Sequence, residues 1–375
     1  MKTKNFYFAG KYDSIFRFCL GMISFALFCL IVFSCDTTEP GNNKVDLNPK
    51  LHSVFYWGIK DPTTLIPNTG VSVGPSILFP TWTVNKKIFF YSSELINNIY
   101  KKGIFEIEIN PNDYSLINNE YKLYEYDFNI LNILNVSSTG EILLLVLKNG
   151  NSVPIIAQLE GNYLVEKEIL LDISWNVKGI SIWNHKEGFI FYGQDPQNNI
   201  TGFYSLLKNT NNEYETKRIL AIDDPGLNKT NFITSYDGEN LFFGLNESEL
   251  NSNGTMQLLK LSLTEEGEMP IVILERKGGY IDVAQNPVNQ GLFLVNYFFG
   301  GNSLVEPQGH IELFDSATLQ SVDLNIRTHI WLNRFIINEH PSWSPDGKHF
   351  TFSAGAFDGE GGRYDLELWI YEDVP

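Results

Sequence analysis

The sequence predicts an all-β fold built from repeated antiparallel hairpin units, and three observations lead to it. A turn followed by an apolar strand recurs at intervals of about 50 residues. Aromatic residues make up 14% of the chain, which suits sheets that pack face to face. A strand-like segment ahead of the first repeat, residues 52–59, has no unit of its own.

The clearest unit spans residues 340–371, at the end of the sequence, and its centre is a turn with a physical cause. Pro345 presets φ for one corner, Asp346 can accept a hydrogen bond from the backbone ahead of it, and Gly347 can take a positive φ. Strand-like runs lie on both sides of this turn. The segment is therefore predicted to be a tight β-hairpin.

Five degenerate copies of this unit precede it. The equivalent turn positions are Lys86, Gly140, Gly188, Gly238, Gly291 and Gly347. Their spacing of about 50 residues is the length of one four-stranded blade. Residues 51–375 are thus predicted to form a six-bladed β-propeller of four-stranded antiparallel blades. Five, seven or eight blades remain alternatives, because the count depends on spacing more than on motif.

The start and the end of the repeats are expected to meet. The last strand, residues 366–371, lies close to the end of the sequence, so the sixth unit has three strands and lacks its outermost one. Residues 52–59 would supply that strand. The predicted propeller is therefore closed by an N-terminal strand, which removes open sheet edges.

The final unit also resembles a known repeat. Trp343-Ser344-Pro345-Asp346-Gly347-Lys348, followed by Leu368-Trp369-Ile370-Tyr371, is similar to the repeat of TolB-like, WD40-like propellers. The match is close over this one unit only. The resemblance implies protein–protein interaction in the cell envelope as the expected function.

Residues 1–34 are predicted to be a lipoprotein signal peptide. A basic start containing Lys11 and Arg17 precedes an apolar stretch, residues 18–33, that is shorter than the roughly 20 residues of a bilayer span. Val32-Phe33-Ser34-Cys35 resembles a bacterial lipobox, which implies lipid attachment at Cys35 and a location in the cell envelope, anchored to the outer membrane. An uncleaved N-terminal anchor is the alternative. Residues 35–50 are expected to be a flexible tether.

Cysteine content and charge exclude several classes. The 3 cysteines all lie in residues 19–35, so the repeats hold no disulfide and no thiol-based metal site. The chain has 27 Lys and Arg against 44 Asp and Glu, a net charge of −17. So acidic a protein is not expected to bind nucleic acid or anionic lipid surfaces directly. No cofactor or metal motif is found.

The connections between the second and third strands of the units are long and are predicted to form the binding face: residues 92–102, 193–201, 244–255, 296–308 and 353–365. Candidate binding residues there are Tyr297, Phe298, Phe299, Asp358, Glu360, Arg363 and Tyr364. The plainer alternatives are that the aromatic residues continue a strand into the core and that the charged residues form a solvated loop.

The function expected from these features is that of a protein-binding or scaffold module. The alternative is a glycan-binding or glycan-cleaving propeller that uses its central channel. Motifs of hydrolases, zinc proteases and nucleotide-binding enzymes are absent from the sequence. His310 and His340 are expected near the blade interiors or the channel, where each could pair with a carboxylate, most simply as structural histidines. The sequence leaves the ligand, the partner and the oligomeric state open.

Cys35→Ala should abolish fatty-acid labelling and release the protein from membranes, because the lipid would be the only strong membrane contact. Metabolic labelling with a radioactive or clickable fatty acid, followed by membrane fractionation, measures both effects. An unchanged membrane fraction would contradict the lipoprotein prediction.

Overall fold

The computed structural model describes residues 50–56, 77–83, 86–96, 99–183, 186–222, 232–235, 237–246, 255–264, 268–298, 309–326, 335–357 and 363–374. The chain divides into two units, Met1–Val45 and Asp46–Pro375. All described residues belong to the second unit, so the predicted signal peptide and Cys35 lie outside them. No helix long and apolar enough to cross a membrane occurs in the described ranges.

The regular structure of the described residues is β-strand, as predicted. The strands are β1 Leu51–Tyr56, β2 Leu78–Trp82, β3 Lys87–Ile96, β4 Ile99–Ile109, β5 Leu116–Glu125, β6 Asn129–Val136, β7 Glu141–Lys148, β8 Asn151–Glu160, β9 Tyr163–Ile169, β10 Asn176–Trp183, β11 Gly188–Gln194, β12 Thr201–Lys208, β13 Tyr214–Ala221, β14 Phe232–Thr234, β15 Asn240–Asn246, β16 Thr255–Ser262, β17 Ile271–Lys277, β18 Gly279–Gln285, β19 Leu292–Phe298, β20 Gly309–Asp315, β21 Gln320–Asp323, β22 Phe335–Trp343, β23 Phe350–Phe357 and β24 Arg363–Tyr371.

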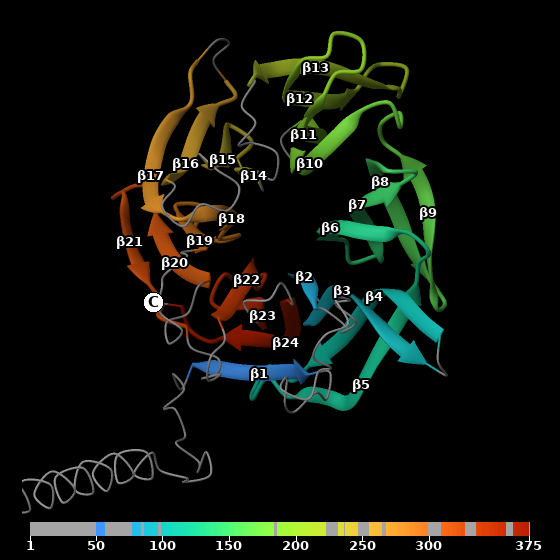
Figure 1. The fold of residues 1–375 in the computed structure, drawn as a ribbon, viewed down its shortest axis with the longest axis vertical. Coiled ribbons are helices and arrows are strands. Elements are labelled where there is room, and N and C mark those ends of the chain that lie inside the picture. Colours follow the sequence, from blue (N-terminus) through green and yellow to red (C-terminus); the bar gives the residue numbers. More distant parts are fainter. Residues whose placement is uncertain are drawn as a thin grey trace, which may run out of the picture. The chain divides into compact units, whose positions relative to one another are not determined.

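These strands form antiparallel meanders, in which each strand pairs with the next along the chain. Three four-stranded sheets are β10–β13, β14–β17 and β18–β21, and a fourth has the order β1-β24-β23-β22. An eight-stranded sheet consists of the meanders β2–β5 and β6–β9, joined by one parallel pair, Glu125↔Tyr163. Within the unit Asp46–Pro375 the meanders stand in a ring, with their first strands toward its centre (Figure 1). The chain is a β-propeller.

Burial along the strands follows from this arrangement. The second strand of a meander is packed on both faces, so β7 is a nearly continuous apolar run with burial from Ile142 to Val146. The outermost strand β13 is charged and exposed along most of its length. Apolar clusters fill the space between neighbouring meanders; one joins Tyr192 and Phe203 to Phe232 and Phe243. The largest fully buried side chains are mostly aromatic, which confirms the prediction that aromatic residues fill the core.

Strand β1 completes the last sheet, as the sequence predicts. It pairs antiparallel with β24 through Leu51↔Tyr371, His52↔Ile370 and Ser53↔Trp369. Beyond the strand, the Glu372 amide donates to the Lys50 carbonyl at 2.8 Å. The first strand of the unit is therefore the outermost strand of its last sheet.

The turn after β22 has the predicted geometry. Gly347 has φ +70°, the Lys348 amide donates to Asp346 Oδ1 at 3.2 Å, and the Ser344 amide donates to the His349 carbonyl at 2.8 Å. Glycine is required here for a second reason. A Cβ on Gly347 would stand 2.4 Å from Asn286 Oδ1 of the neighbouring turn, and Asn286 Nδ2 donates to the Gly347 carbonyl at 2.7 Å.

Two expectations about the connections are wrong. Residues 353–365 are mostly strand, because β23 continues to Phe357 and β24 begins at Arg363, and these two residues pair. Residues 92–102 do not form a long loop, because β3 and β4 continue through this segment to the pair Ile96↔Ile99. Strand pairing satisfies the backbone groups that a loop would leave to water. This connection of the first meander is therefore short, and it adds little to the predicted binding face.

Deleting residues 51–60 should remove the cooperative unfolding transition, because β24 would become an exposed edge next to a core open to water. Differential scanning calorimetry of the soluble fraction measures the transition. Deleting residues 36–45 is the matched control and should leave the transition unchanged. A cooperative transition of unaltered midpoint in the first deletion would contradict closure by β1.

Candidate functional site

The inner strands of the ring converge on one cavity of about 480 Å³. Its lining comes from the first strand of every meander, β2, β6, β10, β14, β18 and β22. Pro287 and Pro345, which lie in the turns after β18 and β22, also line it. The cavity therefore lies toward the turns between first and second strands, the opposite end of the meanders from the predicted binding face.

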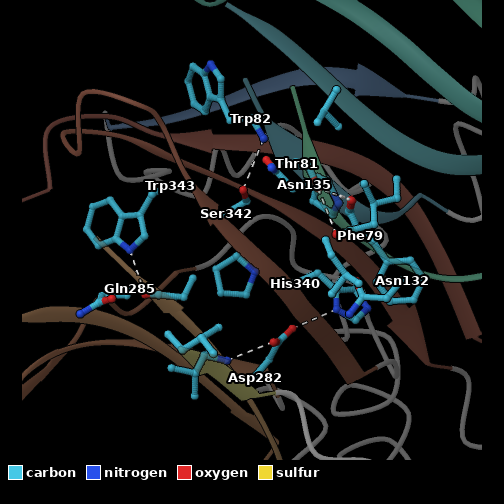
Figure 2. A pocket seen from close by; sticks show the side chains of 18 of the residues that line it. Phe79, Thr81, Trp82, Asn132, Asn135, Asp282, Gln285, His340, Ser342 and Trp343 are labelled. Atoms are coloured by element: carbon cyan, nitrogen blue, oxygen red, sulfur yellow. Dashed lines mark hydrogen bonds and ion pairs between the residues drawn. The ribbon is translucent and has the colours of Figure 1, made fainter. Parts of the chain in front are cut away.

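An imidazole–carboxylate pair lies in the wall of this cavity. His340 Nδ1 is 3.0 Å from Asp282 Oδ2, and the two side chains are 9% and 13% exposed. Because a carboxylate accepts, Nδ1 carries the proton and donates to Asp282. Asp282 Oδ1 also accepts from the Val283 amide at 3.0 Å, and His340 Nε2 lies 3.6 Å from Glu339 Oε2. The pair joins β22 to β18 across the boundary of two meanders (Figure 2).

Two lining residues have backbone conformations that are rare for side chains of their size. Phe79 has φ +54° and His340 has φ +53°. Each precedes a proline, which favours an extended conformation instead, and each lies where its strand shifts register. Their rings contact each other, with centroids 4.6 Å apart. Such conformations cost about 1–3 kcal/mol each and cluster at functional sites.

Hydrogen bonds between meanders hold the wall in place. Trp343 Nε1 donates to the Ala284 carbonyl at 3.0 Å, and the Trp82 amide donates to Ser342 Oγ at 3.3 Å. Thr81 Oγ1 donates to the Ile133 carbonyl at 3.4 Å. Each bond joins inner segments of different meanders, so the lining side chains are held by the ring and not by one strand alone.

Two amides of the lining have no such partner. The side chains of Asn132 and Asn135, both on β6, make no hydrogen bond with any other described residue. Residues three apart on a regular strand face opposite sides, but the register of β6 shifts between Ile133 and Asn135. Both residues therefore line the same cavity, with Asn132 half-buried and Asn135 exposed (Figure 2).

The charge of the wall limits what it can hold. Of the described residues that line the cavity, none is lysine or arginine and Asp282 is the one carboxylate. In the described ranges no group of three or more His, Cys, Asp or Glu is arranged to hold a metal ion. The geometry suits hydrogen bonding to a ligand without negative charge.

None of the sequence-predicted binding residues is among the described residues that line this cavity. Tyr297 is 9% exposed, donates its hydroxyl to Glu312 Oε1 at 2.9 Å and stacks on His310. Burial, and next the charge of Glu312, raise the pKa of Tyr297 well above its usual range. Phe298 ends β19. Arg363 and Tyr364 begin β24, paired with Phe357 and Ala356. Phe299, Asp358 and Glu360 lie outside the described residues, as does Cys35.

Sequence reasoning aligned two segments as copies of one unit but missed the aromatic ring that precedes the proline in each, Phe79 and His340. Phe79-Pro80-Thr81-Trp82 and His340-Pro341-Ser342-Trp343 share the order aromatic ring, proline, hydroxyl, tryptophan. Both lie at bulges on inner strands, and both line the cavity. His340 was expected from the sequence as a structural histidine; the ring–proline order that it shares with Phe79 was the signal that could have assigned it to the wall of a site.

Comparisons with known proteins give backbone similarity only. No protein-family model matches the chain, and no curated protein matches it. A chain of the crystal structure of the nidogen/laminin complex has a TM-score of 0.44 at 11% identity, covering 80% of this chain and 98% of that one. The Dos1 propeller has a TM-score of 0.38 at 8% identity, covering 79% and 68%. The β-propeller domain of the Trilobed protease from Pyrococcus furiosus has a TM-score of 0.43 at 12% identity, covering 76% and 81%. At these values the propeller assignment rests on the sheets themselves.

Asp282→Ala should lower the free energy of unfolding by about 1–3 kcal/mol, because it leaves the buried His340 Nδ1 without its acceptor. Asp323→Ala is a matched control. Asp323 also pairs with a histidine, His310, at 3.2 Å, but the two side chains are 42% and 22% exposed, so its loss should cost less than about 1 kcal/mol. Urea unfolding of both variants measures the difference. Equal losses of unfolding free energy in the two variants would contradict a stabilising, buried Asp282–His340 pair at the cavity.

Proposed function

We propose that this chain is an exported, lipid-anchored protein of the cell envelope whose propeller acts as a binding module. The observation that carries the proposal is the convergence of the inner strands on one cavity whose wall is fixed by hydrogen bonds between meanders. Preorganised polar and aromatic groups around a concave site are typical of binding proteins. The partner is a cell-envelope protein, a ligand within the cavity, or both.

We propose that the propeller has six blades. The eight-stranded sheet counts as two, because β2–β5 and β6–β9 are complete meanders joined by a single residue pair. Each has its own inner strand at the cavity. The resemblance of residues 343–348 to the TolB-like repeat favours that type of propeller, and its envelope function.

The proposed location rests on sequence features. The lipobox-like segment ending at Cys35 supports attachment to the outer membrane through lipid. The net charge of −17 argues against direct contact with anionic headgroups and with nucleic acid. Membrane contact is therefore assigned to the lipid, and ligand contact to the propeller.

A glycan in the central cavity is the second candidate, and the open amides of Asn132 and Asn135 favour it. Amide side chains offer a donor and an acceptor in one plane, as sugar hydroxyls require. A protein partner would instead use the connections between second and third strands, including the segment from β19 to β20. The two candidates occupy opposite ends of the meanders.

Crosslinking in intact cells, followed by affinity purification of the lipid-anchored protein, tests the protein partner. Removing residues 300–307, between β19 and β20, should lose a specific protein that the full chain recovers. Removing residues 265–268, between the third and fourth strands β16 and β17 and so at the other end of a meander, is the matched control and should retain it. Both variants must first keep the thermal transition of the full chain. Recovery that is unaffected by the first removal would contradict a partner at this connection.

A further inference from the structure

We propose that the central cavity binds an uncharged, hydroxyl-rich ligand of roughly one or two sugar units, held by the amides of Asn132 and Asn135 opposite the Asp282–His340 pair. This inference rests on the proposed function of the propeller as a binding module. It specifies the chemical class of the glycan proposed above as the second candidate ligand. The cavity of about 480 Å³ falls within the range of about 300–1,000 Å³ that is usual for small-molecule sites.

The charge of the described lining residues disfavours an anionic ligand. Phosphates, uronates and nucleotides are recognised by arginine, lysine or helix N-termini, and the described lining contains no lysine or arginine. Its one carboxylate, on Asp282, would repel an anion. That carboxylate is also engaged by His340 and by the Val283 amide, so it is not a vacant counter-ion for a cationic ligand.

The hydrogen-bonding groups of Asn132 and Asn135 favour a ligand that carries hydroxyl groups. Each amide of Asn132 and Asn135 supplies two donors and one acceptor oxygen, none of which is used within the described residues. A hydroxyl both donates and accepts, so adjacent hydroxyls of a sugar ring can satisfy an amide in both senses. The bulge in β6 places the half-buried Asn132 and the exposed Asn135 on the same side of the strand, at the wall of one cavity, which a regular strand would not do.

An apolar surface accompanies these amides. The Phe79 ring lines the cavity and contacts the His340 ring. The C–H faces of a sugar pack on such surfaces while its hydroxyls bond to amides. The hydrogen bond from His340 to Asp282 and the contact between the two rings restrain these rings before a ligand arrives, which lowers the entropy cost of binding.

The lining indicates binding without cleavage. Most glycoside hydrolases place two carboxyl groups across the scissile bond. Among the described lining residues Asp282 is the single acid, and it already accepts two hydrogen bonds. The cavity thus has the groups to hold a neutral glycan and lacks, in its described part, the second carboxylate for hydrolysis.

Isothermal titration calorimetry of the full propeller with a panel of sugars tests this assignment. The neutral probes are maltose, cellobiose and N,N′-diacetylchitobiose, the anionic probes are glucuronic acid and N-acetylneuraminic acid, and the cationic probe is glucosamine. We expect at least one neutral disaccharide to bind with Kd below about 1 mM and the charged probes not to bind. Asn132→Ala and Asn135→Ala should each weaken that binding at least tenfold.

Asn162→Ala is the matched control, because Asn162 lies in the exposed turn between β8 and β9; it should leave the affinity unchanged. Each variant is first checked by thermal melting, so that loss of fold is not mistaken for loss of binding. The assignment is overturned by an absence of neutral binders, by a charged probe that binds more tightly, or by affinity that survives both cavity variants. Recovery of a protein partner through residues 300–307 would be unaffected by any of these results, so the two proposals fail separately.

Discussion

The pairing of β1 with β24 is the constraint on which the rest of the structure depends. It joins the first described strand to the last, so that each meander has a neighbour on both sides. Without it, β24 would have a free edge, and the cluster that joins Val54 and Phe55 to Phe90 and Ile370 would lose its outer members. Closure therefore protects both the backbone hydrogen bonds and the core between the last sheet and the first.

The cavity is a consequence of the closed ring. Its lining residues come from six inner strands, and bonds such as Trp343 Nε1 to the Ala284 carbonyl cross from one meander to the next. The strained backbone at Phe79 and His340 is maintained because the surrounding strands fix it. A site of this kind is held by the whole ring, so its geometry does not depend on any one loop.

The repeating features of the fold could be predicted from the sequence, whereas the residues of the cavity could not. Turn chemistry at Asp346 and Gly347, the spacing of the turns and the strand ahead of the first repeat are local or periodic signals. The structure agrees with the first two, and with the third over residues 52–56. The cavity depends on which residues six distant strands place together, and on bulges such as that in β6, which no short window encodes. Tyr297 shows the same limit: its ring is buried and its hydroxyl donates to Glu312 on the neighbouring strand β20, a contact that the residues around Tyr297 do not encode.

Native-state hydrogen exchange of the amides in β1 and β24, followed by mass spectrometry, tests the closed ring most directly. If β1 is an integral strand of the last sheet, its amides and those of β24 will exchange with the same opening free energy, close to that of global unfolding. Rapid exchange of β1 beside a protected β24 would contradict the account, because the ring that shapes the cavity would then not be closed by this strand.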